Sequence, residues 1–293
     1  MSDMSEAASD SISSTAPQEL KFDDARPLED APYPFLIMEN FLDQAFCDQL
    51  VSEFPDETEV LEWQSVMGGR RRLGSEQKRF YRFLDEKPAW KRLYGLLNSE
   101  QFVAAIFDRF GAELKELANQ PDRPWVFDPD LLRRRASDYA GYSLLDRFKL
   151  KLGMKLDNDP VPAPADKDRI YLHFDISYAT DGYKREIHRD SDPRIAAFLI
   201  YFSDAAETGG SGGEFGVHRL PAGSGKPFVA KPDDGTTETV AMLRAQKNLF
   251  VLFLSQPNSY HSVPEIMGAN GARKFIYVGV SSERRYWREG GVA

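Results

Sequence analysis

Hydrophobic residues recur with two different spacings along the chain, and the spacing changes near residue 168. Before that point, apolar residues at every fourth position predict a helix over 42–54. Similar apolar stripes predict helical structure in one or two pieces over 87–117, and a short apolar run predicts a strand at 35–38. The first half of the chain is therefore expected to be mostly helical.

After residue 168, short apolar runs alternate with turns that are rich in Gly, Pro, Asn and Asp. No helical stretch of ten residues separates the runs, which argues against the strand–helix alternation of a parallel sheet. The pattern predicts a mainly β fold with flanking helices, either a sandwich or a jelly roll, buttressed by the N-terminal helices. The expected strands are 169–179, 183–188, 195–202, 213–218, 238–243, 248–254, 259–265 and 273–281.

These patterns divide the chain into four predicted segments. Residues 1–28 are rich in Ser, Ala and acidic residues and are expected to form a disordered tail. A mostly helical support region at 29–167 is followed by the β core at 168–287 and a short C-terminal tail at 288–293. The Pro- and Asp-rich stretch before residue 168 marks the boundary. A short amphipathic helix is expected at 144–156.

Composition and charge exclude several classes of protein. With 42% hydrophobic and 28% charged residues, the chain is expected to fold around a sizeable core. Its net charge of -9 makes nucleic acid an unlikely partner. The single cysteine, Cys47, excludes an internal disulfide and a cysteine-based zinc site, and it suits the cytoplasm. No apolar run approaches the roughly 20 residues that span a membrane, so no membrane contact is expected.

The chain has four histidines, and two of them have an aspartate two residues later. These pairs are His173 with Asp175 and His188 with Asp190. Because residues i and i+2 of a strand point to the same side, either pair could present an imidazole and a carboxylate together. A non-haem Fe(II) centre that activates O₂ uses two imidazoles and one carboxylate and keeps its other face open. His261, on a later predicted strand, could supply the second imidazole.

The stretch 178–281 resembles the Fe(II)/2-oxoglutarate-dependent dioxygenase superfamily, and its prolyl-hydroxylase-like branch in particular. The resemblance depends on several elements that occur here in the family order. They are His-Arg-Asp at 188–190, an apolar strand, the glycine-rich turn with Glu214, a second apolar strand, His-Ser-Val at 261–263 and Gly-Ala-Arg at 271–273. The resemblance implies a double-stranded β-helix, or jelly roll.

Site residues follow from this resemblance. His188, Asp190 and His261 match the iron ligands of the family. Arg273 matches the arginine that pairs with the distal carboxylate of 2-oxoglutarate, and Tyr201 matches the tyrosine that donates its hydroxyl to the same carboxylate.

Two further positions bear on the co-substrate. Tyr178 resembles the tyrosine near the other end of 2-oxoglutarate. The family often has a serine two residues after the arginine, whereas Phe275 stands there in this chain, so the serine contact is missing or replaced.

The activity implied by the resemblance is hydroxylation of an organic substrate with release of succinate and CO₂. It requires Fe(II), 2-oxoglutarate and O₂, with ascorbate as a candidate reductant. Family members that halogenate have a small residue in place of the carboxylate, so Asp190 indicates hydroxylation or a related oxidation. A protein residue, an amino acid and a small metabolite all stay open as substrate, and so does the oligomeric state.

Alternative functions stay open beside this interpretation. The chain could be a non-catalytic jelly-roll module that binds a metal or ligand, or a zinc hydrolase that uses the same three ligands. The second ranks last because no His-Glu-x-x-His motif is present. His173 with Asp175 is expected to line the barrel mouth or contact substrate, and His218 to be a polar strand end or a substrate contact.

The loops are expected to select the substrate. The basic stretch 68–82 is predicted to be a solvated loop rather than an anion-binding surface. The candidate selecting segments are 60–85, 119–167, 203–212 and 219–237.

Overall fold

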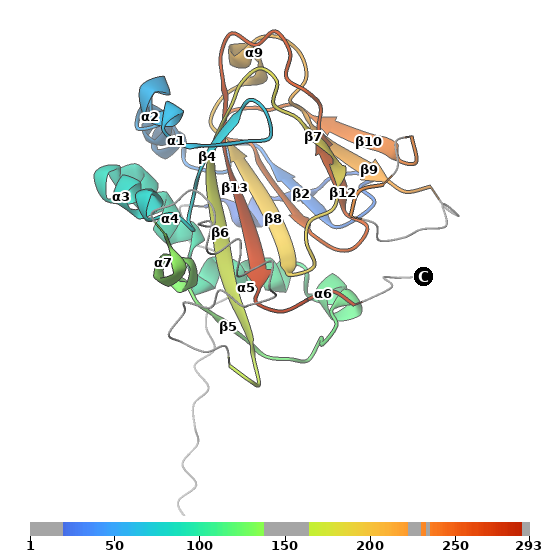
Figure 1. Ribbon diagram of the computed structural model, residues 1–293. Coiled ribbons are helices and arrows are strands. Elements are labelled where there is room, and N and C mark those ends of the chain that lie inside the picture. The colour runs from blue at the N-terminus through green and yellow to red at the C-terminus, as the bar shows by residue number, and fades with distance from the viewer. Residues whose placement is uncertain (1–19, 138–163, 222–229, 233–234, 289–293) are drawn as a thin grey trace, which may run out of the picture.

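Two β-sheets pack against each other in the computed structural model (Figure 1), which describes residues 20–137, 164–221, 230–232 and 235–288. The larger sheet has nine strands, eight of them in the order β1-β2-β11-β8-β13-β6-β4-β3, with β5 paired to β6. The smaller sheet has the order β10-β9-β12-β7. Pairing is antiparallel except between β5 and β6. The mainly β, jelly-roll fold expected from the sequence is therefore confirmed.

All eight strands predicted after residue 168 are present. In the larger sheet they are β6 (Asp168–Ala179), β8 (Arg194–Tyr201), β11 (Phe250–Leu254) and β13 (Arg273–Ser282). In the smaller sheet they are β7 (Arg185–His188), β9 (Phe215–Arg219), β10 (Glu238–Leu243) and β12 (Tyr260–Val263).

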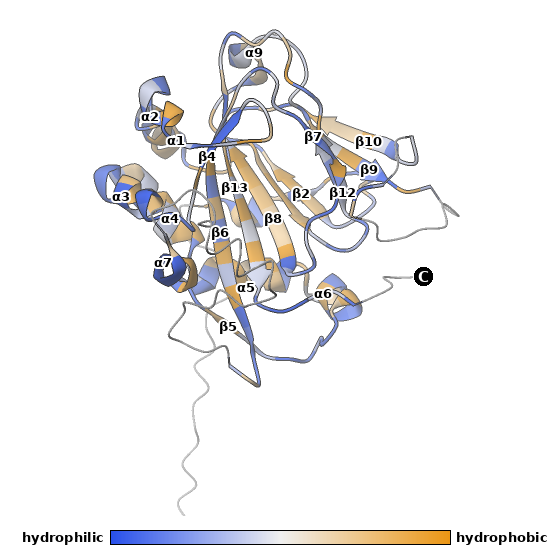
Figure 2. Ribbon diagram, in the orientation of Figure 1, coloured by the Kyte–Doolittle hydropathy of each residue, from blue (hydrophilic) through white to orange (hydrophobic). Residues whose placement is uncertain are grey.

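Central strands of the larger sheet are apolar on both faces because both faces are covered (Figure 2). Along β8, Phe198 and Ile200 point into a cluster shared with the helices, whereas Leu199 and Tyr201 point into a cluster between the two sheets. This alternation matters for function, because only the second set of side chains faces the interior of the jelly roll.

Helices from the first half of the chain pack on the outer face of the larger sheet (Figure 1). The predicted helix at 42–54 is confirmed as α1, whereas the stretch 87–117 forms three helices rather than one or two. Ser99 ends one and begins the next by accepting a hydrogen bond from the backbone N–H of Phe102. The helices are α1 (Gln44–Ser52), α2 (Glu57–Leu61), α3 (Lys78–Glu86), α4 (Pro88–Leu97), α5 (Glu100–Arg109), α6 (Gly111–Leu117), α7 (Leu131–Arg135) and the short α9 (Ala205–Thr208).

The N-terminal region also contributes strands to the larger sheet. β2 pairs with β11 and β4 pairs with β6, so the sheet extends beyond the expected core at 168–287. These strands are β1 (Arg26–Pro27), β2 (Phe35–Met38), β3 (Gln64–Val66), β4 (Arg70–Gly74) and β5 (Trp125–Phe127).

Two predictions for this region need correction. The stretch 68–82 is not a solvated loop, since it forms β4 and the start of α3, and Arg70 within it is buried. The tail does not extend to residue 28, because Leu20 and Phe22 are buried in the core and Phe22–Asp24 forms a short 3-10 helix.

Some expectations concern parts of the chain that the structure does not describe. Residues 1–19 and the predicted helix at 144–156 lie outside the described residues. Within the described ranges, no helix is long and apolar enough to cross a membrane.

We expect Phe198→Ala to lower the free energy of unfolding by about 3–5 kcal/mol, since it leaves a cavity in the core. Phe198 is fully buried on β8, and its ring lies 5.5 Å from that of Phe102 on α5 and 5.6 Å from that of Phe250 on β11. Urea denaturation of both proteins measures the change. Met242→Ala is the control, since Met242 is 42% exposed and should change stability by less than about 0.5 kcal/mol. Equal losses in both variants would contradict this view of the core.

Candidate metal centre

Pairing of β7 with β12 brings His188 and His261 together. The two residues are register partners across the antiparallel pair, and their ring centroids are 4.3 Å apart. Asp190 follows the end of β7 by two residues. Each of the three side chains offers one ligand atom, and these atoms lie within 4.8 Å of one another. The structure therefore places the three predicted iron ligands in one cluster.

Backbone carbonyl groups orient both imidazoles. The Nδ1 of His188 donates to the carbonyl oxygen of Glu186 at 2.8 Å, and that of His261 donates to the carbonyl oxygen of Ser259 at 3.0 Å. Because Nδ1 carries the proton in each ring, Nε2 keeps its lone pair, which lies 4.0 Å from Asp190 in His261 and accepts from Nε of Arg185 in His188. This is the ring orientation that supports a metal-binding histidine.

Two hydroxyl groups hold the carboxylate of Asp190. Ser255 and Tyr277 both donate to Oδ2, each at 3.0 Å, which leaves Oδ1 on the side of His261, 4.0 Å from its Nε2. Our sequence analysis missed both residues. Tyr277 could have been found from strand alternation, because it lies four residues after Arg273 on the same face of a strand that begins there.

Burial keeps both imidazoles of the cluster neutral. Burial is the main cause that lowers the pKa of His188 to about 3, and the charges of His261 and Arg185 lower it further. Burial also lowers the pKa of His261. Burial alone would raise the pKa of Asp190, but the charges of His261, Arg194 and His188 outweigh it and lower that pKa. At neutral pH the cluster therefore offers two neutral imidazoles and a carboxylate.

Metal-free protein is expected to lose stability as the pH falls below 6.5. The pKa of His218 is lowered to about 4, mainly by burial, so three histidines including His188 and His261 protonate less readily when folded than when unfolded. Protons then bind preferentially to the unfolded chain between pH 6.5 and the folded-state pKa values. Each histidine should contribute about 1 kcal/mol of destabilisation by pH 5.5.

Denaturation in chelator at pH 7.5 and 5.5 measures this effect. His218→Gln should remove about a third of it, because this histidine lies outside the metal cluster. A free energy of unfolding that stays constant between the two pH values would contradict the expectation.

An interior cavity of about 310 Å³ opens beside the cluster. His188, Asp190 and His261 line it, together with Arg273, the arginine predicted to bind the co-substrate. The remaining lining residues are Met67, Arg70, Asp175, Tyr183, Arg185, Arg189, Ser191, Arg194, Leu199, Phe215, Val263, Phe275 and Tyr277. The cavity therefore joins the candidate metal ligands to Arg273, whereas Tyr201 is not among the residues that line it.

Arg273 is a buried cation held among aromatic rings. Its guanidinium carbon lies 4.7 Å from the ring centroid of Phe275, 5.5 Å from that of Tyr183 and 5.6 Å from that of Tyr201. None of its three guanidinium nitrogens has a hydrogen-bond partner among the described residues, and neither has the buried hydroxyl of Tyr201. Buried donors without partners are rare, so this pair fits an anionic ligand.

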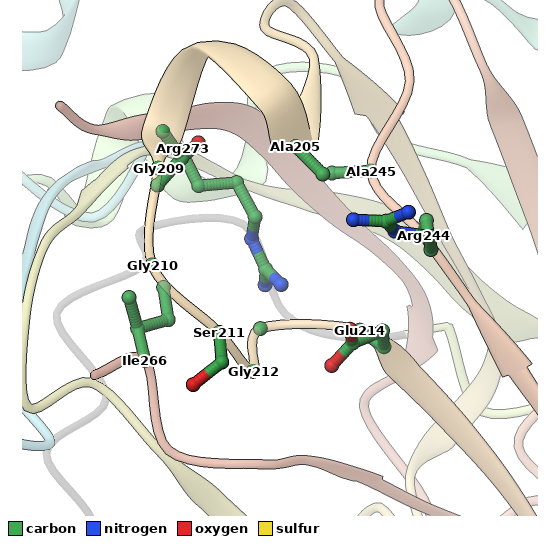
Figure 3. A pocket seen from close by; sticks show the side chains of 12 residues that line it. Ala205, Gly209, Gly210, Ser211, Gly212, Glu214, Arg244, Ala245, Ile266 and Arg273 are labelled. Atoms are coloured by element: carbon green, nitrogen blue, oxygen red, sulfur yellow. The ribbon is translucent and has the colours of Figure 1, made fainter. Parts of the chain in front are cut away.

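A second, smaller hollow of about 30 Å³ borders Arg273 on another side (Figure 3). The glycine-rich turn 209–213 and Glu214 line it, with Arg244 opposite. Four of these glycines have positive φ, and a Cβ on Gly212 would lie 1.9 Å from the carbonyl oxygen of Glu265. The glycines therefore allow the turn to pack closely against the backbone near Glu265.

Tyr178 does not lie where the resemblance placed it. Ser177 and Ala179 flank it on β6, and Ala179 packs into the cluster between the sheets, so Tyr178 points to the opposite face and packs against the helix-side cluster. It does not line the cavity, and we correct the prediction accordingly. Tyr183, which our sequence analysis missed, occupies the cavity wall near Arg273 instead.

The rival pair, His173 and Asp175, belongs to a second cluster that also contains Glu76. The Nε2 of His173 lies 3.0 Å from a Glu76 carboxylate oxygen. Arg72 forms ion pairs with both carboxylates of this cluster, and Arg70 approaches Asp175 at 3.3 Å. Because arginines already neutralise these carboxylates, the cluster forms an ion-pair network that supports the cavity wall.

His218 is satisfied within the smaller sheet. One of its ring nitrogens lies 2.7 Å from the hydroxyl of Ser262 and the other lies 3.3 Å from that of Thr239. It does not line the cavity, which favours the expectation of a polar strand residue over that of a substrate contact.

Comparisons with known proteins match the fold and not the sequence. No protein-family model matches the chain, and no match is found among curated proteins. Solved structures that match include prolyl 4-hydroxylases from Phytophthora capsici, at 11% identity and a TM-score of 0.44, and from Pseudomonas putida, at 12% and 0.44. HygX from Streptomyces hygroscopicus, solved with nickel, 2-oxoglutarate and hygromycin B, matches at 10% identity and a TM-score of 0.43.

The extent of these matches varies. They cover 85%, 85% and 87% of this chain, and 59%, 93% and 86% of the three structures in the same order. The chain thus spans less than two thirds of the Phytophthora structure.

Proposed function

We propose that this protein is an Fe(II)- and 2-oxoglutarate-dependent dioxygenase that hydroxylates an organic substrate and releases succinate and CO₂. The observation that carries the proposal is a single cavity that joins two sites. One is the cluster of two imidazoles and a carboxylate, and the other is the buried, unpaired Arg273 beside Tyr201.

The cluster fits Fe(II) by its donor set. His188, Asp190 and His261 would supply two neutral imidazole nitrogens and one carboxylate oxygen, which is the set that non-haem Fe(II) oxygenases use. The supporting hydrogen bonds from Ser255 and Tyr277 would keep Asp190 in place as a ligand.

Arg273 and Tyr201 would bind the distal carboxylate of the co-substrate. The guanidinium offers a planar fork, and the tyrosine hydroxyl adds a third donor direction. Phe275, which stands where the family often has serine, packs against the guanidinium and so fixes its position instead of contacting the carboxylate.

Iron with 2-oxoglutarate and O₂ would supply the oxidising chemistry, in which one oxygen atom enters the succinate and the other enters a substrate C–H bond. The chain supplies position and a protected environment. Phe215, Leu199 and Val263 line the cavity near the ligands and keep that part of the wall apolar.

Isotope labelling tests the proposal. The metal-free protein is loaded anaerobically with Fe(II) and 2-oxoglutarate, exposed to ¹⁸O₂ and assayed for succinate by mass spectrometry. We expect labelled succinate from the wild type and none from His261→Ala or from protein loaded with Zn(II). Bound iron and bound 2-oxoglutarate without any labelled succinate would contradict the proposal and favour a non-catalytic binding module.

A further inference from the structure

The cavity is lined by more positive side chains than its carboxylates can neutralise. Five arginines and two aspartates line it. Asp175 already pairs with Arg70, and Arg189 pairs with Asp192 at 2.7 Å. The co-substrate proposed above would take Arg273. Arg185 and Arg194 then form no salt bridge with a carboxylate among the described residues, and Arg194 acts on Asp190 only through its charge.

Arg194 has a place built for it. A Cβ on Gly279 would lie 0.9 Å from Nη1 of Arg194, so the missing side chain at this β13 position leaves the space that the guanidinium fills. Tyr277 flanks it, with the guanidinium carbon 5.5 Å from the ring centroid. Nε and Nη1 are buried and have no hydrogen-bond partner among the described residues. A buried cation in this state costs free energy unless an anion completes it.

Arg185 is held by an interaction that a bound metal would replace. Its Nε donates to Nε2 of His188 at 3.1 Å, and Nη1 lies 3.6 Å from the sulfur of Met67. The Nε2 lone pair of His188 is also the one that faces the candidate metal position. Once a metal takes this lone pair, Arg185 loses its acceptor and becomes free to bind an anion beside the metal.

We propose that the primary substrate is a small organic acid whose carboxylate binds Arg185 and Arg194. The proposal rests on the proposed function, because it takes Arg273 to be occupied by 2-oxoglutarate. Guanidinium groups bind carboxylates through two parallel hydrogen bonds. These hydrogen bonds are strongest where water is excluded. A cavity of about 310 Å³ suits small ligands and not a folded partner.

Matched ligand pairs test this proposal without turnover. Protein loaded with Zn(II) and saturating 2-oxoglutarate is titrated calorimetrically with benzoate, phenylacetate and 3-phenylpropionate, with the primary amide of each acid, and with phenyl phosphate. At least one carboxylate should bind ten or more times more tightly than its amide. Arg185→Gln and Arg194→Gln should each remove this preference, and the corresponding lysine variants should restore part of it.

Two further variants sharpen the test. Gly279→Ala keeps Arg194 in the chain but displaces its guanidinium, so it should reproduce the loss seen in Arg194→Gln. Arg244→Gln, which changes an exposed arginine outside the main cavity, should keep the preference. Thermal melting of each variant shows whether it has folded.

The outcomes separate the two proposals. Failure of the wild type to bind Zn(II) and 2-oxoglutarate would count against the proposed function itself. If both bind but no carboxylate exceeds its amide, or if the preference survives both glutamine variants, the organic-acid substrate is overturned alone. Preferential binding of phenyl phosphate would also overturn it, since the oxyanion would then be a phosphate.

Discussion

Asp190→Ala is expected to abolish iron binding and turnover. The aspartate supplies the only carboxylate among the three candidate ligands, and its removal would leave two neutral imidazoles that cannot balance the metal charge. The loss of affinity should exceed the roughly 10–100-fold that removal of a supporting hydrogen bond costs. Metal content after dialysis against Fe(II) under anaerobic conditions measures it directly.

Asp175→Ala serves as the matched control for this prediction. Asp175 also lines the cavity and also follows a histidine by two residues, but its partners are Arg70 and Arg72. We expect this variant to keep its metal, although the loss of the ion pairs should lower its stability. Iron retained by Asp190→Ala and lost from Asp175→Ala would place the metal in the other cluster.

Arg273→Gln should weaken the binding of 2-oxoglutarate without affecting the metal. Truncating one partner of a buried charge pair costs about 2–5 kcal/mol, which corresponds to a roughly 30- to 4,000-fold rise in Kd. Tyr201→Phe removes one neutral donor and should cost about tenfold or less. Equilibrium titration of the Zn(II)-loaded protein with 2-oxoglutarate gives both values.

The comparison with Arg194→Gln makes this prediction specific. Both arginines are cavity cations with unpaired nitrogens, but only Arg273 is assigned to the co-substrate. We expect Arg194→Gln to bind 2-oxoglutarate within a few-fold of the wild type. A larger loss in Arg194→Gln than in Arg273→Gln would mean that the two assignments have to be exchanged.

Much of the β core could be predicted because its signal is local. β11 consists of apolar residues that are buried on both faces, and so does β8 after Arg194 at its start. Turns with Pro or Asn bound these strands. The metal cluster could also be predicted. The family resemblance identified His188, Asp190 and His261 together, and the strand pairing places His188 opposite His261.

What the sequence did not reveal depends on pairing between distant segments. β4 consists of three arginines, a leucine and a glycine, and it has no apolar alternation, so its place beside β6 comes only from tertiary contacts with Asp175 and Ser177. The misassignment of Tyr178 has a different cause. Tyr178 was assigned by its distance in sequence from His188, and such an assignment fails when the residue lies on the face of the strand that points away from the site, as Tyr178 does.

The visible spectrum of the anaerobic complex tests the central claim most directly. Metal-free protein is mixed with Fe(II) and 2-oxoglutarate, and the metal-to-ligand charge-transfer band is recorded for the wild type, His188→Ala and His173→Ala. The structure predicts a band in the wild type and in His173→Ala and no band in His188→Ala. No band in the wild type despite bound iron, or a band that survives only in His188→Ala, would contradict the assignment of His188, Asp190 and His261 as the iron site.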